Sequence, residues 1–258
     1  CGNEDSLQGA IDAAEEGAAI SVPARTYNES ISISKSIYLT CAEDCIIDAS
    51  GLFHAVSITA NDVSVDGFEI IGDGSTVSGV TIANAQNIVV SNNEIHGMAL
   101  PNPGNISPAS YGVLVYGGAL NTNSNILIDG NEIYDINLFG ISLSQEVIGV
   151  LIQNNIIRDL QTLAVNPLQF AADALGLPEV DLEWWESALE GSGINVDDEH
   201  DVSVGIFAAG AGFYAGGNSF ENVSFGISSA VCVGGMESNT FDNVYVYALN
   251  VISEDHGD

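Results

Sequence analysis

A short motif centred on asparagine recurs along the chain and constrains the possible folds more than any other feature. In residues 126–136, its clearest copy, alternating apolar residues lead into Gly130 and Asn131, and Glu132 and Ile133 follow. The motif asparagines are Asn93, Asn131, Asn155, Asn218 and Asn239. An apolar alternation interrupted by a small residue and an asparagine predicts a strand, a sharp bend and a second strand.

The spacing of the motif indicates a repeat. Successive motif asparagines are 38, 24, 63 and 21 residues apart, which indicates a base period of 21 to 24 residues with two insertions. A second series agrees with this period: Tyr111-Gly112-Val113, Phe139-Gly140-Ile141, Val204-Gly205-Ile206 and Phe225-Gly226-Ile227. Short β-rich units at a fixed period, with no helix between them, predict a parallel β-solenoid whose coils bury apolar side chains only against their neighbours.

The repeated polar and aromatic residues have a structural interpretation. We predict that the asparagines of successive coils form a ladder, in which each side-chain amide bonds backbone groups of the turn above or below. Phe68, Phe220 and Phe241 are assigned to one apolar series, in which other coils have isoleucine. We interpret these aromatic residues as core and not as sugar-binding platforms.

The N-terminal part of the chain carries the more specific resemblance. It begins with a helical pattern and continues with short apolar runs, at residues 7–17, 20–23, 27–31 and 37–39. This succession is similar to the capping helix and first coils of the right-handed parallel β-helix, or pectin-lyase-like, superfamily. The resemblance implies an all-β fold, a right-handed parallel β-helix, in a single domain over residues 1–258.

A capping helix is predicted at residues 6–17. Ser6 is a suitable N-cap, Gly17 is a suitable stop, and the apolar residues between Leu7 and Ala14 fall on one helical face. That face is expected to cover the first coil, whose strand edges would otherwise be open to unwanted pairing.

The composition excludes several partners. The chain has 3 Lys and Arg residues against 35 Asp and Glu residues, a formal net charge of -32. Such a surface repels nucleic acid, anionic lipid and anionic polysaccharide, and it attracts cations or suits high salt. Without an apolar run of 18 residues or more, no transmembrane segment is predicted.

The start of the chain and its cysteines favour secretion to the cell exterior. The chain begins Cys1-Gly2-Asn3 without Met, from which we expect that a signal segment was removed. Disulfides or intermolecular cross-links are expected at Cys1, Cys41, Cys45 and Cys232. The alternative for Cys1 is a lipid anchor, as in lipoproteins. For Cys41 and Cys45, a local disulfide and links to other chains both stay open. Glycosylation sequons begin at Asn28, Asn105 and Asn222.

Two insertions interrupt the repeat. The first, residues 98–110, is a loop that contains three prolines. The second, residues 161–200, is predicted to contain two helices, at residues 166–176 and 178–191. Trp184 and Trp185 lie in the second helix. They are candidate assembly contacts, because this flap can either fold back on a coil or project toward another chain.

An acidic cluster follows the second insertion. It comprises Asp197, Asp198, Glu199 and Asp201, next to His200. Carboxylate oxygens suit Ca²⁺, but calcium loops space their carboxylates along a turn. A solvated loop is therefore the first interpretation and a Ca²⁺ site the second, and otherwise no cofactor is expected.

The superfamily resemblance raises the question of an enzyme. Its lyases use an Arg or Lys base beside Ca²⁺-binding carboxylates, and here only Arg158 lies near the middle of the chain. Its hydrolases carry four motifs: Asn-Thr-Asp, an Asp pair, Gly-His-Gly and Arg-x-Lys. In this chain only the Asp pair has a counterpart, Asp197-Asp198. We therefore predict no catalytic residues and no enzymatic activity, since a fold does not by itself confer a function.

What remains is a secreted, acidic solenoid with small residues concentrated in residues 205–217 and cysteines near both ends. Flat faces of Gly and Ala would allow close packing of neighbouring molecules. We therefore expect a structural protein that forms a homopolymer, as a sheath, surface layer or filament, similar in character to archaeal sheath and surface-layer subunits. The alternatives are a glycan-binding or glycan-cleaving β-helix and a lipid-anchored surface adhesin.

Overall fold

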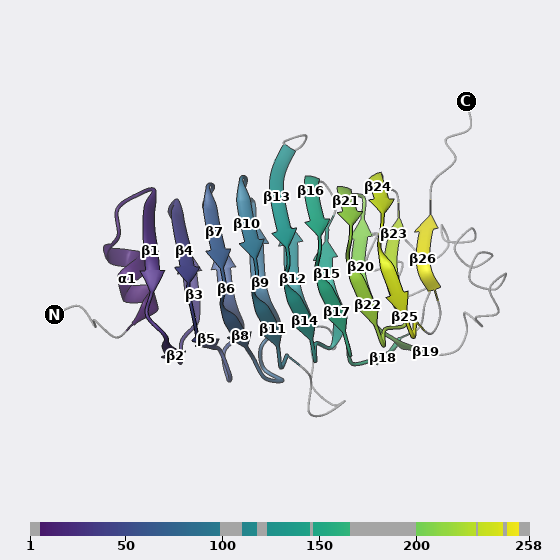
Figure 1. Ribbon diagram of the computed structural model, residues 1–258, viewed down its shortest axis with the longest axis horizontal. Helices are drawn as coiled ribbons and strands as arrows, with labels where there is room; N and C mark the ends of the chain where they lie inside the picture. Colours follow the sequence, from purple (N-terminus) through teal and green to yellow (C-terminus); the bar gives the residue numbers. More distant parts are fainter. Residues whose placement is uncertain are drawn as a thin grey trace.

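The computed structural model describes residues 6–98, 110–117, 123–144, 147–165, 200–230, 232–244 and 247–252. In these ranges the chain winds into coils, and each coil adds one strand to each of three parallel sheets, A, B and C (Figure 1). Helix α1 (Leu7–Ala13) lies at the end of the solenoid where β1 begins (Figure 1). The predicted β-solenoid is confirmed.

Sheet A contains β1 (Ala18–Val22), β4 (Ile37–Cys41), β7 (Val63–Asp66), β10 (Ile88–Ser91), β13 (Asn123–Asp129), β16 (Ile148–Gln153), β21 (Gly212–Gly216) and β24 (Val233–Glu237). Sheet B contains β2 (Arg25–Tyr27), β5 (Cys45–Asp48), β8 (Glu69–Ile71), β11 (Glu94–His96), β14 (Glu132–Tyr134), β17 (Ile156–Arg158), β22 (Ser219–Glu221) and β25 (Thr240–Asp242).

Sheet C contains β3 (Ile31–Ile33), β6 (His54–Ile58), β9 (Ser78–Ala83), β12 (Ser110–Tyr116), β15 (Leu138–Leu143), β20 (Val204–Ala209), β23 (Phe225–Ala230) and β26 (Tyr247–Ile252). A separate antiparallel pair is formed by β18 (Leu163–Val165) and β19 (His200–Val202). This pair brings together the two ends of the second predicted insertion.

The core lies between the three sheets and is built from columns of aligned apolar residues. From β8 onward in sheet B, the middle residues of the strands align in one column, in which the register places Ile70, Ile95 and Ile133. All three are fully buried. Each coil therefore supplies only a thin layer of apolar contacts, so that its stability depends on the coils on either side.

The predicted asparagine ladder is present. Asn131 accepts a hydrogen bond from the backbone N–H of Asn93 and donates its amide to Oδ1 of Asn155, at 3.0 and 2.9 Å. Asn155 repeats this arrangement with Asn218, which does so with Asn239. The side-chain amides also donate to strand carbonyls of the preceding coil, as from Asn131 to Val90 at 2.9 Å.

The prediction that Phe68 belongs to the same column as Phe220 and Phe241 is wrong. The register pairs Glu69 with Glu94, so the residues before them, Phe68 and Asn93, occupy equivalent positions. Phe68 therefore ends the ladder, and its backbone N–H donates to Oδ1 of Asn93 at 3.0 Å. Phe220 and Phe241 do take the column of Ile157, but Phe241, in the last coil, is 36% exposed.

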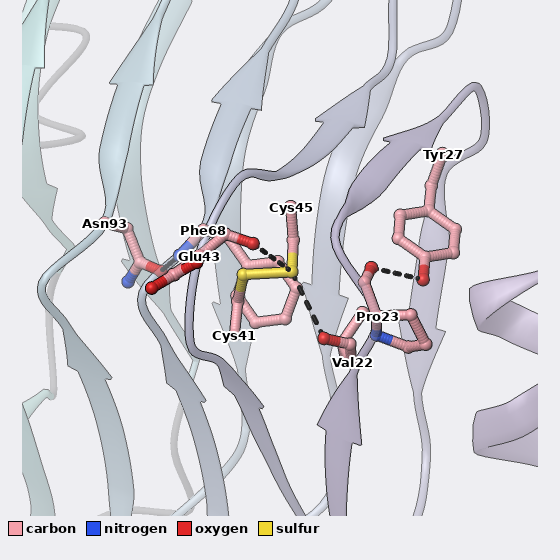
Figure 2. Close-up of a disulfide and its surroundings, with 8 residues drawn as sticks. All are labelled: Val22, Pro23, Tyr27, Cys41, Glu43, Cys45, Phe68 and Asn93. Carbon is pink, nitrogen blue, oxygen red and sulfur yellow. Dashed lines mark hydrogen bonds between the residues drawn. A yellow bond between two sulfur atoms is a disulfide. The ribbon is translucent and has the colours of Figure 1, made fainter.

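Cys41 and Cys45 form a disulfide with a Cα–Cα distance of 5.9 Å. Cys45 precedes Ile46, which pairs with Glu69, so Cys45 takes the position that Phe68 and the ladder asparagines take in later coils. Figure 2 shows the disulfide beside Phe68, with Asn93 beyond it. The local disulfide, one of the two alternatives for these cysteines, is the one that forms.

The capping helix is shorter than the predicted residues 6–17. Ser6 is the N-cap as predicted and accepts from the N–H of Gly9, but the helix ends at Ala13 and Ala14 is extended. Lys35 donates to the carbonyl oxygens of Asp12 and Ala14. A cation at this end complements the helix dipole, whereas the acidic residues that follow Ala14 would oppose a longer helix. Leu7 and Ile11 are buried against the first coils.

The glycines of the second sequence series are explained by close packing. A Cβ atom on Gly112 would lie 2.5 Å from Cγ2 of Ile133, and one on Gly205 would lie 2.5 Å from the ring of Phe220. Both also face the carbonyl oxygen of the next glycine in the column, at 2.6 Å. At these two glycines, sheet C packs so closely on the sheet B column that a Cβ atom would not fit.

The small residues 205–217 do not form the flat outer face that the sequence suggested. Ala208, Ala211 and Ala215 are buried in the core, and Gly205 packs on Phe220. These residues are small because the interior of the last coils has little room for larger ones, since Phe213 and Phe220 also occupy it.

Sheet C is buried on both faces in β9, β15 and β20. Ser142 and Phe207 lie between core positions of β15 and β20 and are each 7% exposed. Tyr111, Phe139 and Phe207 form an aromatic series with centroid distances of 5.2 and 5.3 Å. The outer face of sheet C is therefore shielded from solvent in these strands, whereas Ser32 in β3 and Tyr116 in β12 are exposed.

Candidate functional site

The outer face of sheet B carries the richest group of chemically active side chains in the described ranges. From β8 onward, the first and third residues of each strand point away from the core. Their register forms two rows, the first with Glu69, Glu94 and Glu132, and the second with Ile71, His96, Tyr134, Arg158 and Glu221. The rows bring together groups that are far apart in sequence.

Glu69, Glu94 and His96 form one end of this group. Nε2 of His96 lies 3.1 Å from Oε1 of Glu69, and the possible ligand atoms of the three residues lie within 4.8 Å of one another. The side chain of His96 is 18% exposed and that of Glu69 is 34% exposed. Solvent can therefore reach a group in which two carboxylates and an imidazole converge.

Tyr134 links the two ends of the group. Its ring stacks on the ring of His96, and the two ring centroids are 4.7 Å apart. The guanidinium of Arg158 packs on the Tyr134 ring, with Cζ 4.1 Å from the ring centroid. Its hydroxyl donates to Oε1 of Glu94. Burial, and then the hydrogen bond to Glu94, raise the pKa of Tyr134 well above its usual value. Tyr134 is therefore held as a hydrogen-bond donor.

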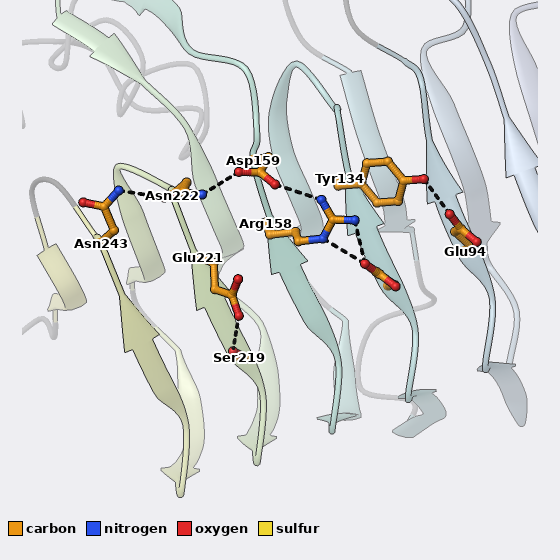
Figure 3. Close-up of polar contacts among 9 residues, drawn as sticks. Glu94, Tyr134, Arg158, Asp159, Ser219, Glu221, Asn222 and Asn243 are labelled. Atoms are coloured by element: carbon orange, nitrogen blue, oxygen red, sulfur yellow. Dashed lines mark hydrogen bonds and ion pairs between the residues drawn. The ribbon is translucent and has the colours of Figure 1, made fainter.

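Arg158 is paired on two sides. Its Nη2 lies 2.7 Å from Oε1 of Glu132, and its Nη1 lies 2.8 Å from Oδ2 of Asp159. Figure 3 shows the series continuing from Asp159 to Asn222 and Asn243, each side chain bonded to the next. The guanidinium thus ties neighbouring coils together, although the side chain is 30% exposed.

The lowered pKa of Asp159 gives a first expected result. The hydrogen bond from Asn222, and then that from Arg158, lower the pKa of this carboxyl. The pKa of Asp159 is lower in the folded protein than in the unfolded chain, where it is about 3.9. The ionised carboxylate therefore stabilises the folded protein above about pH 3.9, and this stabilisation is lost as the pH falls through the folded pKa. Asn222→Gly is expected to raise the pKa of Asp159 and reduce this acid dependence.

NMR titration of the aspartate side chains would measure the change. Glycine suits the site because the φ angle of Asn222 is 52°. Asn243, with a φ of 51°, donates to Asn222 and not to Asp159, so Asn243→Gly is the matched control. An Asp159 pKa that is the same in Asn222→Gly and in the parent protein would contradict the assignment of its cause.

The three basic residues of the chain all contact groups of the chain itself. Lys35 caps α1, Arg25 lies over the ring of Tyr27 at 4.7 Å from its centroid, and Arg158 pairs as described above. Each basic group is therefore engaged with other groups of the chain.

A second polar cluster, on sheet C, is closed to substrates. Nδ1 of His54 lies 2.7 Å from Oγ of Ser78, which lies 2.5 Å from Oγ1 of Thr81. Burial lowers the pKa of His54. Although a histidine beside a serine could activate a nucleophile, Ser78 is 0% exposed and Thr81 is 2% exposed. This cluster is part of the packing of sheet C.

The residues predicted as sites are placed only in part. The following lie outside the described residues: Cys1, Asn105, Trp184, Trp185, Asp197, Asp198 and Glu199. Asp201 lies in β19, and nothing of its side chain is described. Among the predicted insertions, residues 99–109 and 166–199 also lie outside the described ranges.

The other predicted site residues lie far from the sheet B group or at its edge. Asn28 is exposed between β2 and β3, whereas the Asn222 amide donates to Asp159. The thiol of Cys232, just before β24, donates to the carbonyl oxygen of Ala208 at 3.4 Å. In the part of the chain that the structure describes, no helix is long and apolar enough to cross a membrane.

Sequence reasoning missed the convergence of Glu69, Glu94, His96 and Tyr134. A signal was present, because the residues one and three places after a ladder asparagine point outward in the same two rows. Glu94 and His96 follow Asn93 in this way, and Glu132 and Tyr134 follow Asn131. Aligning the repeats on their asparagines would have placed these side chains together.

Comparison with solved structures finds several chains that are similar to this one. An alginate lyase from Paenibacillus sp. str. FPU-7 is similar in structure, with a TM-score of 0.44 and 13% identity over 96% of each chain. The pectin methylesterase from Aspergillus niger gives a TM-score of 0.47 and 10% identity, over 92% of this chain and 81% of that chain. PfbA, a surface protein and adhesin of Streptococcus pneumoniae, gives 0.29 and 14%, over 96% and 95%.

These similarities assign no activity to the chain, and a search of curated proteins found no match. The family model described as right handed beta helix region matches residues 33–206, which is more than half of the 258 residues. Those residues include most coils of the solenoid and the ladder asparagines Asn93, Asn131 and Asn155. They also include the sheet B residues from Glu69 to Arg158. The chain therefore belongs to the right-handed β-helix family.

Proposed function

We propose that this protein is a non-catalytic, extracellular structural subunit, an acidic β-helix that associates with further copies of itself at a cell surface. The observation that carries the proposal is the internal use of all three basic residues, Arg25, Lys35 and Arg158. A protein that binds or cleaves an anionic polysaccharide needs accessible cationic groups, because its own carboxylates would otherwise repel the ligand.

Arg158 bears most directly on the alternative of a lyase. A catalytic base has to reach the proton that it removes, and the guanidinium of Arg158 is held by Glu132, Asp159 and the ring of Tyr134. Two carboxylates beside it favour its charged form. This geometry supports a role for Arg158 in joining coils.

The two ends of the solenoid differ in a way that supports self-association. Helix α1 covers the end at β1 (Figure 1), whereas β24, β25 and β26 are the last strands of their sheets and each has one strand neighbour in the described ranges. Open strand edges pair readily with other chains. We therefore place the proposed contact at the end formed by β24, β25 and β26.

The disulfide supports an extracellular location, because disulfides persist in oxidising compartments. The disulfide also limits which cysteines could form the cross-links between molecules that the sequence suggested. Cys41 and Cys45 are bonded to each other, so they are not available for links between molecules while that bond is intact. Association through the strand edges requires no cross-link.

Incubation of the purified protein with polyuronates and neutral glycans, with and without Ca²⁺, is expected to give no cleavage products. Reducing-end assays and absorbance of unsaturated products would detect hydrolysis and elimination separately. Arg158→Leu serves as the comparison, since a lyase would lose activity in this variant. Cleavage by the parent protein that disappears in Arg158→Leu or in Asp198→Asn would overturn the non-catalytic part of the proposal.

Association is tested by measuring molar mass with light scattering over a range of concentration and salt. Thr240 is exposed in β25, at the open end, and Thr40 is exposed in β4, away from it. Thr240→Asp adds a negative charge to each copy at the proposed contact, where like charges repel. We expect Thr240→Asp to shift the protein toward the monomer and Thr40→Asp to leave its mass unchanged. Equal behaviour of the two variants would argue against this end as the contact.

A further inference from the structure

We propose that Glu69, Glu94 and His96 form a binding site for a divalent metal ion of the zinc type, on the outer face of sheet B. The site is independent of the function proposed above. It follows from the register of β8 and β11, which aligns Glu69 with Glu94, and from the two-residue spacing that puts His96 on the same face as Glu94.

The distances between the ligand atoms fit a small cation. Two ligand atoms about 2.0 to 2.1 Å from a tetrahedral Zn²⁺ ion are about 3.3 Å apart. Nε2 of His96 and Oε1 of Glu69 are 3.1 Å apart, and Glu94 contributes an oxygen within 4.8 Å of both. A change of side-chain torsion at Glu94 would close the remaining distance, since the backbone already aligns the three residues.

The ligand types select the class of ion. Imidazole nitrogen suits Zn²⁺, Ni²⁺ and Cu²⁺, whereas Ca²⁺ takes six to eight oxygen ligands. Two carboxylates balance the charge of one divalent ion, and the imidazole adds no charge when it is neutral. Three protein ligands leave a coordination position open to water, and the partial exposure of His96 and Glu69 gives access to it.

Tyr134 holds this group from its other side. Its hydroxyl donates to Oε1 of Glu94, and its ring stacks on His96 with an interplanar angle of 5°. Partners of this kind orient ligands and increase metal affinity. Tyr134 is itself fixed by Arg158, which packs on its ring and pairs with Glu132. The network that joins the coils therefore also orients the proposed ligands.

Calorimetric titration with ZnCl₂, in buffer containing excess CaCl₂, separates this site from general attraction of cations to an acidic surface. We expect one Zn²⁺ ion to bind per chain at a site that excess Ca²⁺ does not occupy. His96→Gln and Glu69→Gln are expected to weaken Zn²⁺ binding by at least about tenfold. Glu43→Gln is the control for Glu69→Gln, because it also removes one carboxylate, at an exposed residue of the turn between Cys41 and Cys45. It is expected to leave the affinity for Zn²⁺ unchanged.

Two further measurements keep the proposal testable if a ligand variant fails to fold. Tyr134→Phe keeps the stacked ring but removes the hydrogen bond to Glu94, and it is expected to weaken binding by about tenfold. In the parent protein, Zn²⁺ is expected to shift the ¹⁵N resonance of Nε2 in His96. Unchanged affinity in a folded His96→Gln variant, a shift at another histidine alone, or equal competition by Ca²⁺ would each overturn the proposal.

Discussion

Replacing Asn155 with alanine is expected to lower the free energy of unfolding by about 4 kcal/mol. Asn155 is 0% exposed, and its amide donates to the carbonyl oxygens of Ile128 and Gln153 and to Oδ1 of Asn218. Its Oδ1 accepts from the backbone and the side chain of Asn131. Alanine would leave several of these buried groups without partners, and each such group costs about 1 to 3 kcal/mol.

Urea denaturation followed by circular dichroism would measure this loss. Asn154, the preceding residue, is exposed, has a φ of 56° and bonds Oδ1 of Asp129, so Asn154→Gly removes one exposed bond without straining the backbone. We expect that control to lose no more than about 1 kcal/mol. A lower m-value in Asn155→Ala would show that the coils on either side have begun to unfold separately. Similar losses in the two variants would mean that the ladder is not a main source of stability.

Replacing Gly140 with alanine is expected to lower the free energy of unfolding by about 3 kcal/mol. The added Cβ atom would lie 2.7 Å from the carbonyl oxygen of Gly205 and 2.7 Å from Cγ2 of Ile157. Neither can move far, because the carbonyl belongs to the backbone of β20 and Ile157 is fully buried in the central column. Relief of the contact would require sheets B and C to separate locally.

Gly235→Ala is the matched control for this prediction. A Cβ atom at Gly235 would meet only the Tyr214 ring, at 3.3 Å, and a side chain can rotate away. Thermal and urea unfolding of the two variants are expected to differ, with a loss of less than about 1 kcal/mol in Gly235→Ala. A Gly140→Ala protein as stable as its parent would show that the spacing between the sheets is not set by this glycine column.

The repeat and its asparagine ladder could be predicted from the sequence because both depend on local order. Asn93, Asn131 and Asn155 each follow a strand of alternating apolar residues, and that pattern requires a bend at the asparagine wherever the coil is placed. The same reasoning gave the N-cap at Ser6. It did not give the end of α1, since that depends on Lys35, which reaches the helix from the next coil.

Phe68 and the small residues of 205–217 show where local order was not sufficient. Phe68 was assigned to an aromatic series by its type, but the pairing of Glu69 with Glu94 places it in the asparagine column. The small residues looked like an outer face, and the structure buries most of them because Phe213 and Phe220 fill the interior of those coils. Which face a residue takes depends on what its neighbours in space already occupy.

The sequence alone therefore determined the coil: its length, its bends and the alternation that separates inward from outward residues. These properties repeat within some twenty residues, so the pattern carries them without reference to distant parts of the chain. Only the tertiary structure decided which outward residues meet, because insertions change the spacing between coils while the register of β8, β11 and β14 stays the same. Glu69 and His96 come together for this reason, although 27 residues separate them in sequence.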